Sequence, residues 1–246
     1  DYLVALEGHP LAGAGVKPTG ERFPVDGDGI RLLSPVIPSK VYGLAKNYEA
    51  HAQFMHESGH SEIAHAPEDM VIFSKPSTSV IGPDDPIVIP SYSNDMNFEP
   101  EVAVIMGRIA KNVPVEKAMD YVLGFTCVND VTLRDLQGLD PMWTRAKGFD
   151  TSCPLGPWIQ TELDWKDAKI SFTLNGEDVP MASGTTANLI HGIPEQIAAI
   201  SSFSTLLPGD VIMTGTPNAS GHLDPGDEPI VHVAGIGSLR NVVVRG

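Results

Sequence analysis

The sequence is poor in cysteine, in positive charge and in long apolar runs. Its two cysteines, Cys127 and Cys153, form no Cys-x-x-Cys pair, which argues against a zinc ribbon and a disulfide scaffold. Both lie among apolar residues, so we expect small core residues in a reducing, cytoplasmic compartment. No apolar run approaches the roughly 20 residues that cross a bilayer. Residues 1–20 lack the basic start and apolar core of a signal peptide.

Acidic residues far outnumber basic ones, and the formal net charge is −15. An excess of this sign argues against nucleic acid and anionic membranes as partners. It also makes an anionic substrate unusual, unless a local cation receives it. The 246 residues suffice for one large domain, or for a main domain with a small appendage.

Short β-rich runs separated by glycine and proline dominate the chain, and helical spacing appears only in residues 47–58, 113–122 and 193–206. This pattern is typical of a β-dominated α+β protein. Residues 1–35 are glycine-rich and less regular, which predicts a small N-terminal subdomain before a main domain of residues 36–246. The predicted strands lie in SKVYGLA, DMVIFSKP, PIVIP, EVAVIMG, YVLGFTCVND, KISFTLNG, GDVIMTG and EPIVHVAG.

Residues 55–70 are polar and show little periodicity, which predicts a long surface loop. Loops of this length often close over a site. His56, His60 and His65 lie in this segment, but their spacing is not that of a structural metal site. We therefore interpret them as solvated loop histidines.

Two acids, Glu99 and Glu101, open the apolar run VAVIM. Alternate residues of a strand face the same side, so both acids share a face with apolar residues, and the opposite face is apolar too. Two adjacent buried carboxylates must take up a proton, pair with cations or bind a metal. The alternative is an exposed strand start, where both acids are solvated or paired with arginine.

A third acid, Asp130, ends the apolar run YVLGFTCVN at another strand-to-loop edge. Three carboxylates suit Mg²⁺ or Mn²⁺, which prefer octahedral oxygen ligands. Three further positions would stay open. A 2-oxo acid could fill two of them through its keto oxygen and one carboxylate oxygen.

Several blocks occur in an order that resembles the fumarylacetoacetate hydrolase family over residues 38–246. The resemblance implies a β-roll or β-sandwich core with a few short helices, a catalytic domain of residues 36–246, and a homodimer. It also implies that Glu99, Glu101 and Asp130 hold Mg²⁺ or Mn²⁺. The blocks are VYGLAKNYEAHA, FSKPSTSVIGPDDPIVIP, NFEPEVAVIMGR, GFTCVNDVTLRDLQ, WTRAKGFDTSCPLGPWI, LLPGDVIMTGTP and VAGIGSLRNVV.

The resemblance assigns His51 to catalysis. In acylpyruvate-hydrolysing relatives, the matching histidine pairs with a glutamate three residues later to activate water. Here that position is Phe54. Glu57 lies in the same segment and is the candidate replacement, and the alternative for His51 is an ordinary surface histidine.

Lys147 matches the family's substrate-contacting lysine, where an ammonium would stabilise a developing enolate. An exposed lysine is the alternative, with Arg145 as a competitor for the role. By the same resemblance, Gln137 contacts the ligand and Arg134 supports the site. Arg134 alternatively only pairs with Asp135.

The segment MTGTP follows a predicted strand. Thr214, Gly215 and Thr216 offer hydroxyl and backbone N–H groups that could bind a substrate carboxylate. An ordinary turn is the alternative.

These residues favour divalent-metal-dependent C–C bond cleavage of a small 2-oxo acid, a mono- or dicarboxylate, with decarboxylation of oxaloacetate to pyruvate and CO₂ through a metal-stabilised enolate as the preferred reaction. Decarboxylation needs only an electron sink, whereas hydrolysis needs an oriented base, which Phe54 puts in doubt. Hydrolysis of a fumarylpyruvate-type acylpyruvate and isomerisation of 2-hydroxyhepta-2,4-diene-1,7-dioate stay open. A non-catalytic binding module for a metal or small molecule is the alternative of another class.

Overall fold

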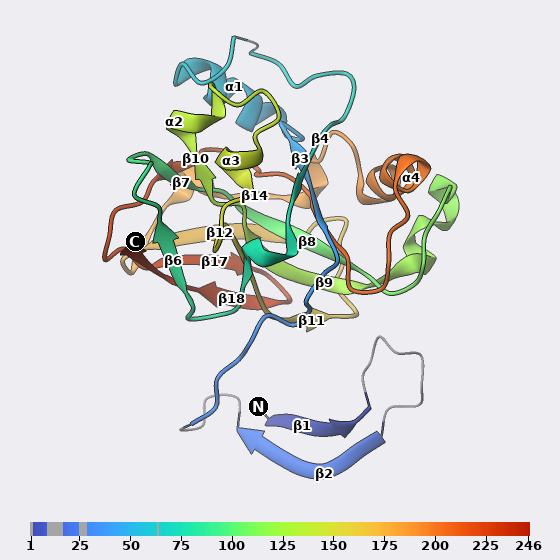
Figure 1. Ribbon diagram of the computed structural model, residues 1–246. Coiled ribbons are helices and arrows are strands. Elements are labelled where there is room, and N and C mark those ends of the chain that lie inside the picture. Colours follow the sequence, from blue (N-terminus) through green and yellow to red (C-terminus); the bar gives the residue numbers. More distant parts are fainter. Residues whose placement is uncertain (1, 9–16, 25–28, 63) are drawn as a thin grey trace. The chain divides into compact units, whose positions relative to one another are not determined.

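The computed structural model describes residues 2–8, 17–24, 29–62 and 64–246 (Figure 1). The chain divides into two compact units, residues 1–32 and 33–246. The parts of the predicted subdomain and loop that lie outside the described residues are 1, 9–16, 25–28 and 63.

The first unit contains an antiparallel pair, β1 (Tyr2–Glu7) and β2 (Lys17–Pro24), where the sequence indicated irregular structure. The β2 sequence KPTGERFP has no alternation of apolar and polar residues. Such alternation is the main sequence signal of a half-buried strand, and without it the strand could not be predicted.

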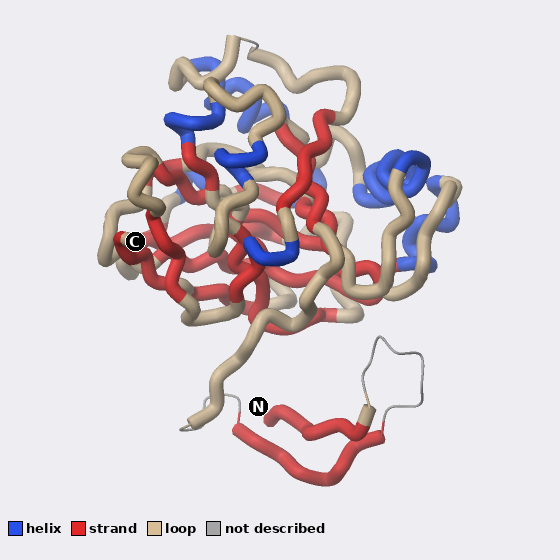
Figure 2. Tube along the Cα trace, viewed as in Figure 1, coloured by secondary structure: helices blue, strands red, loops and turns tan. Residues whose placement is uncertain are grey.

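The second unit is built mainly from strands (Figure 2). Its largest sheet has seven strands in the order β4-β3-β15-β8-β9-β11-β5. Their bounds are β3 (Val41–Ala45), β4 (Val71–Lys75), β5 (Val80–Ile81), β8 (Pro100–Met106), β9 (Val122–Asn129), β11 (Cys153–Gln160) and β15 (Val211–Met213).

Three smaller sheets complete this unit. A five-stranded sheet consists of β12 (Lys169–Leu174), β13 (Glu177–Asp178), β14 (Gly184–Thr185), β17 (Pro229–Val233) and β18 (Gly237–Arg240). The others are β10 (Thr132–Leu133), β7 (Met96–Phe98) and β16 (Gly221–His222), and the parallel pair β6 (Pro86–Ile89) and β19 (Val242–Arg245). All eight strands expected from the sequence are present, which confirms a β-dominated α+β fold.

The core lies between these sheets. All seven residues of β8 are buried, which confirms that this strand is covered on both faces. Phe98, the last residue of β7, stacks on Phe172 of β12, with ring centroids 4.0 Å apart. Cys127 and Cys153 are buried free thiols whose pKa values are raised by burial to about 12, as expected of core residues.

Helices are few and short. The α-helices are α1 (Glu49–Glu57), α2 (Arg134–Gln137), α3 (Thr144–Lys147) and α4 (Ile193–Phe203). The 3₁₀ helices are η2 (Ser77–Ser79), η3 (Val115–Tyr121), η4 (Pro180–Ala182) and η5 (Thr186–Asn188). Among the described residues, no helix has the length and apolar character needed to span a membrane.

The helix predicted over 113–122 is therefore a 3₁₀ helix, which begins after Pro114. The helix predicted over 193–206 ends at Phe203, because Leu206 pairs with Ala110 in an isolated β-bridge. Figure 1 shows α1, α2 and α3 gathered over one end of the largest sheet, and these helices carry several residues of the site described next.

Candidate active site

Glu99, Glu101 and Asp130 meet where β7, β8 and β9 adjoin. Glu99 lies in a one-residue gap between β7 and β8. The Glu99 N–H donates to the Asn129 side-chain oxygen at 2.9 Å, and the Asp130 N–H donates to the Glu99 carbonyl at 2.8 Å. These bonds fix Asp130 beside Glu99, while β8 carries Glu101.

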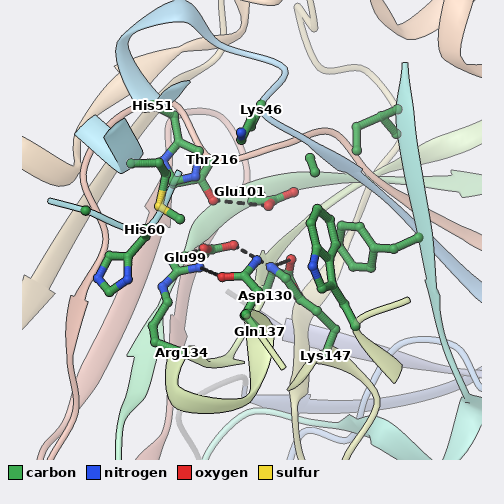
Figure 3. Close-up of a pocket in the computed structure, with 17 residues that line it drawn as sticks. Lys46, His51, His60, Glu99, Glu101, Asp130, Arg134, Gln137, Lys147 and Thr216 are labelled. Carbon is green, nitrogen blue, oxygen red and sulfur yellow. Dashed lines mark hydrogen bonds and ion pairs between the residues drawn. The ribbon is translucent and has the colours of Figure 1, made fainter. Parts of the chain in front are cut away.

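One carboxylate oxygen from each of the three acids lies within 4.8 Å of the other two (Figure 3). The exposed fractions of Glu99, Glu101 and Asp130 are 4%, 2% and 1%. The alternative of an exposed, solvated strand start is therefore wrong. Among the described residues, no histidine or cysteine joins this group.

Three buried cations, Arg134, Lys147 and Lys75, face Glu99 and Asp130. Arg134 pairs with Glu99, and Lys147 Nζ lies 2.7 Å from Glu99 and 2.5 Å from Asp130. Burial alone would raise the pKa of Glu99, but Arg134 and Lys147 outweigh it and hold that pKa well below its usual range. Glu99 is therefore ionised.

Glu101 has a different environment, with no ion pair to a cation among the described residues. Its carboxylate accepts hydrogen bonds from the Gly215 N–H at 2.6 Å and from the Thr216 hydroxyl at 3.1 Å. Burial, followed by repulsion from Asp130 and Glu99, raises the pKa of Glu101 well above its ordinary value. A proton or a divalent cation would relieve this repulsion.

The donor set fits a hard divalent cation. All three groups are carboxylates, which Mg²⁺ and Mn²⁺ prefer, and one of them lacks a cationic partner. The carboxylates of Glu99, Glu101 and Asp130 could hold such an ion.

Lys147 ends the short helix α3 and is buried, so the exposed alternative is wrong. Burial would lower its pKa, but the charges of Asp130 and Glu99 raise it above the ordinary value. The ammonium also lies 4.8 Å from the centroid of the Phe73 ring, a cation–π distance. Arg145, the competing candidate, is largely exposed beside Asp140.

Arg134 and Gln137 begin and end α2 and meet at the cavity. Arg134 Nη1 donates to Gln137 Oε1 at 2.7 Å, and its Nη2 reaches both Glu99 and the Ser220 hydroxyl. The alternative pairing of Arg134 with Asp135 does not occur: Arg134 pairs with Glu99, and the Asp135 carboxylate accepts from Ser93 at 2.8 Å.

His51 lies on α1 and is buried. Its Nδ1 lies 2.5 Å from the Asn218 carbonyl, so Nδ1 carries the proton and Nε2 is free to accept one. Burial is the largest influence on the imidazole and lowers its pKa, which favours the neutral ring. Phe54 stacks on this ring, at 6.4 Å between centroids.

The sequence did not reveal that a backbone carbonyl orients His51. The candidate Glu57 is exposed, accepts a hydrogen bond from Gln53 at 2.8 Å and does not line the cavity. The structure therefore does not bring Glu57 to His51, and its catalytic role stays a prediction.

A cavity of about 240 Å³ opens onto these groups. Of the three residues predicted to bind a substrate carboxylate, only Thr216 lines it. The Thr214 hydroxyl donates to the Val102 carbonyl, and the Gly215 N–H is used by Glu101. The polar residues that line the cavity are Lys46, His51, His60, Glu99, Glu101, Asp130, Arg134, Gln137, Lys147 and Thr216.

Gly215 has a positive φ of 106°, and a Cβ there would lie 3.0 Å from the Asn47 side chain. This position therefore suits glycine. The predicted MTGTP segment thus serves Glu101 directly, through Gly215 and Thr216, rather than offering a free cradle.

The first three residues of the loop predicted over 55–70 belong to α1, which ends at Glu57. His56, His60 and His65 are exposed, as expected of solvated histidines, and only His60 lines the cavity.

Lys75 is a site residue that sequence reasoning missed. It ends β4, is fully buried, and its ammonium lies 2.8 Å from Asp130 Oδ1 without hydrogen-bond geometry. It donates instead to the backbone carbonyls of Val131, Lys147 and Ser152. A lysine at the end of the apolar strand VIFS was the available signal. Through these bonds, Lys75 connects the backbone at Lys147 to the backbone next to Asp130.

We expect Lys75→Met to lower the free energy of unfolding by about 3–5 kcal/mol, because the change leaves Asp130 with less buried positive charge and takes one hydrogen-bond donor from each of three backbone carbonyls. Urea denaturation measures this loss. Lys169→Met is the matched control, since Lys169 pairs with Asp167 at an exposed site. An equal, small effect of both changes would contradict the role given to Lys75.

The sequence and fold that carry this site are similar to those of known proteins. Residues 40–244 match the family model described as fumarylacetoacetate (FAA) hydrolase C-terminal. Protein Rv2993c of Mycobacterium tuberculosis is 44% identical over 92% of this chain and 83% of its own length. Oxaloacetate tautomerase Fahd2a, mitochondrial, of Rattus norvegicus is 37% identical over 87% of this chain and 70% of its own.

The solved structure of 2-hydroxyhepta-2,4-diene-1,7-dioate isomerase from Mycobacterium marinum is 38% identical, with a TM-score of 0.87. The match covers 99% of this chain and 88% of that one. The matched region contains all three clustered acids together with Lys147 and His51. The chain belongs to the fumarylacetoacetate hydrolase family.

Proposed function

We propose that this chain is a divalent-metal-dependent enzyme that forms the enolate of a small 2-oxo dicarboxylate, represented by oxaloacetate. The supporting observation is that three buried acids, the Lys147 ammonium and the neutral His51 ring line one small cavity. The names of two relatives, an oxaloacetate tautomerase and a dienedioate isomerase, both denote isomerisations.

Glu99, Glu101 and Asp130 would hold Mg²⁺ or Mn²⁺. When bound, such an ion supplies a Lewis acid that polarises a keto oxygen. Lys147 supplies a second positive charge at the same place, since its ammonium lies against two of the three acids. A fixed ammonium in a water-poor cavity stabilises the negative charge that develops on an enolate.

His51 supplies the base. Its Nδ1–H donates to the Asn218 carbonyl, which fixes the ring and leaves the Nε2 lone pair available. This nitrogen can take a proton from the carbon next to the keto group and return it to the enolate oxygen. Keto–enol tautomerisation of oxaloacetate is therefore the first reaction that we propose.

Decarboxylation, which the sequence favoured, is the second candidate and stays a prediction. It uses the same enolate and needs no base, so the buried Lys147 charge supports it equally. Acylpyruvate hydrolysis ranks third. A backbone carbonyl orients His51 here, and a carbonyl stabilises an imidazolium less than the glutamate that Phe54 replaces.

Tautomerisation and decarboxylation can be distinguished by incubating oxaloacetate in D₂O with Mn²⁺-loaded protein. Deuterium entering at the carbon next to the keto group reports enolate formation, and pyruvate reports loss of CO₂. We expect exchange to exceed pyruvate formation. If neither exceeds the rate with Mn²⁺ alone, the proposed function is wrong.

We expect His51→Gln to slow deuterium exchange by about 10²–10⁴-fold, because the base is removed. Mn²⁺ affinity, measured by calorimetry, should stay close to that of the wild type, since His51 is not among the clustered acids. Retained exchange in this variant would assign the base to another residue.

A further inference from the structure

A second amino group, Lys46, reaches the cavity apart from Lys147 (Figure 3). Lys46 follows β3 and is half-buried, and burial lowers the pKa of its ammonium. Its Nζ donates to the Ser61 hydroxyl at 2.6 Å, in the loop that follows α1.

The partners of the cavity's cations set Lys46 apart. Lys147 and Arg134 each pair with a buried acid of the cluster. Among the described residues, Lys46 forms no ion pair with a carboxylate. Its ammonium donates a hydrogen bond to the neutral Ser61 hydroxyl. Of the lysines and arginines that line the cavity, Lys46 is thus the one without a carboxylate partner among the described residues.

The backbone of Lys46 is also unusual. Its φ is 54°, in the left-handed region that residues with a Cβ seldom adopt. Such conformations persist where the surrounding structure holds them, and they occur preferentially at functional sites. Here the neighbouring Asn47 is held in place, because its side chain donates to the carbonyls of His191 and Thr214.

We propose that Lys46 binds the second carboxylate of a dicarboxylate substrate and so determines specificity. The inference rests on the proposed function, in which the 2-oxo acid end lies at the three acids and Lys147. On binding, the ammonium would exchange the Ser61 hydroxyl for the substrate carboxylate. A charged acceptor makes the stronger hydrogen bond to an ammonium, which favours this exchange.

For oxaloacetate this contact also selects the reaction. In decarboxylation, the bond to the second carboxylate breaks, its electron pair passes to the enolate, neutral CO₂ leaves, and the enolate later takes a proton from water. The attraction to Lys46 is lost as CO₂ forms, so the contact stabilises the substrate more than this transition state. In tautomerisation the carboxylate keeps its charge. Lys46 thus favours proton transfer over loss of CO₂.

The test compares oxaloacetate with 2-oxobutanoate, in which a methyl group stands in place of the second carboxylate. For Lys46→Met with Mn²⁺, we expect the KM for oxaloacetate exchange to rise about 10-fold or more, because a charged hydrogen bond is lost. The KM for 2-oxobutanoate should not change, and the ratio of pyruvate to exchanged oxaloacetate should rise. Lys46→Arg should restore most of the wild-type KM.

Equal changes in both KM values, or none for oxaloacetate, would overturn the role of Lys46. Calorimetric binding of both compounds to the Mn²⁺-loaded variants gives a readout independent of turnover. If the wild type exchanges both compounds but binds them equally well, only the role of Lys46 fails. If the wild type exchanges neither compound, the proposed function fails, and the binding data still decide whether Lys46 recognises a carboxylate.

Discussion

Replacing Glu101 with glutamine should abolish Mn²⁺ binding and lower turnover of oxaloacetate by about 10³-fold or more, while the metal-free protein stays folded. Glu101 is a member of the acid cluster that has no cation as a direct partner. Glutamine keeps the shape of the side chain. Its carbonyl oxygen can accept from the Gly215 N–H, and its amide NH₂ can donate to the Thr216 hydroxyl oxygen. Calorimetry with Mn²⁺, together with the exchange assay, measures both losses.

The same variant has a predictable pH dependence of stability. The folded-state pKa of Glu101 is raised above its ordinary value of 4.5, so its contribution to stability is fully present below about pH 4.5. That contribution is lost as the pH rises through the folded-state pKa. Metal-free wild type should therefore lose stability relative to Glu101→Gln as the pH rises.

Glu99 titrates in the opposite sense, since its pKa is lowered, but it is present in both proteins and largely cancels in the comparison. Urea denaturation of both metal-free proteins across this pH range measures the difference. Addition of Mn²⁺ should stabilise the wild type alone. If the stability of the two proteins changed with pH in the same way, the pKa of Glu101 would not be raised in the folded protein.

Replacing Lys147 with methionine should lower oxaloacetate turnover by about 10²–10³-fold, because a fixed positive charge beside the developing enolate is lost. It should also destabilise the metal-free protein by about 3–5 kcal/mol, since Glu99 and Asp130 are left buried with less compensation. Mn²⁺ should restore part of this stability by supplying positive charge at the same acids.

Arg145→Met is the matched control for Lys147→Met. It removes a cation two residues away on the same helix, at an exposed position. We expect turnover and stability close to those of the wild type. If Arg145→Met abolished activity and Lys147→Met did not, the assignment of the catalytic cation would be reversed.

Much of the fold could be predicted because its strands are short, apolar and bounded by glycine or proline. The β8 run VAVIM, with two acids before it, indicated both a covered strand and a metal site. Asp130 could be added because it ends another apolar run. These signals are local, so the sequence alone was sufficient to identify the acids.

The parts that could not be predicted depend on backbone groups or on distant segments. Lys75 lies 55 residues before Asp130 in the sequence (130 − 75), and only the fold brings them together. The partner of His51 is the Asn218 carbonyl, a group that every residue carries, so no side-chain pattern reveals it. Because Phe54 stands where relatives have a glutamate, the sequence suggested that no group orients His51. The structure shows that the Asn218 carbonyl does so.

The central claim is that a divalent ion held by Glu99, Glu101 and Asp130 is required to form the enolate. The most direct measurement is deuterium exchange of oxaloacetate by protein that has been stripped with EDTA and then titrated with Mn²⁺. Our account predicts no enzymatic exchange after stripping and full recovery at one bound Mn²⁺ per chain. Undiminished exchange by the stripped protein, or Mn²⁺ binding of wild-type affinity by Glu101→Gln, would contradict it.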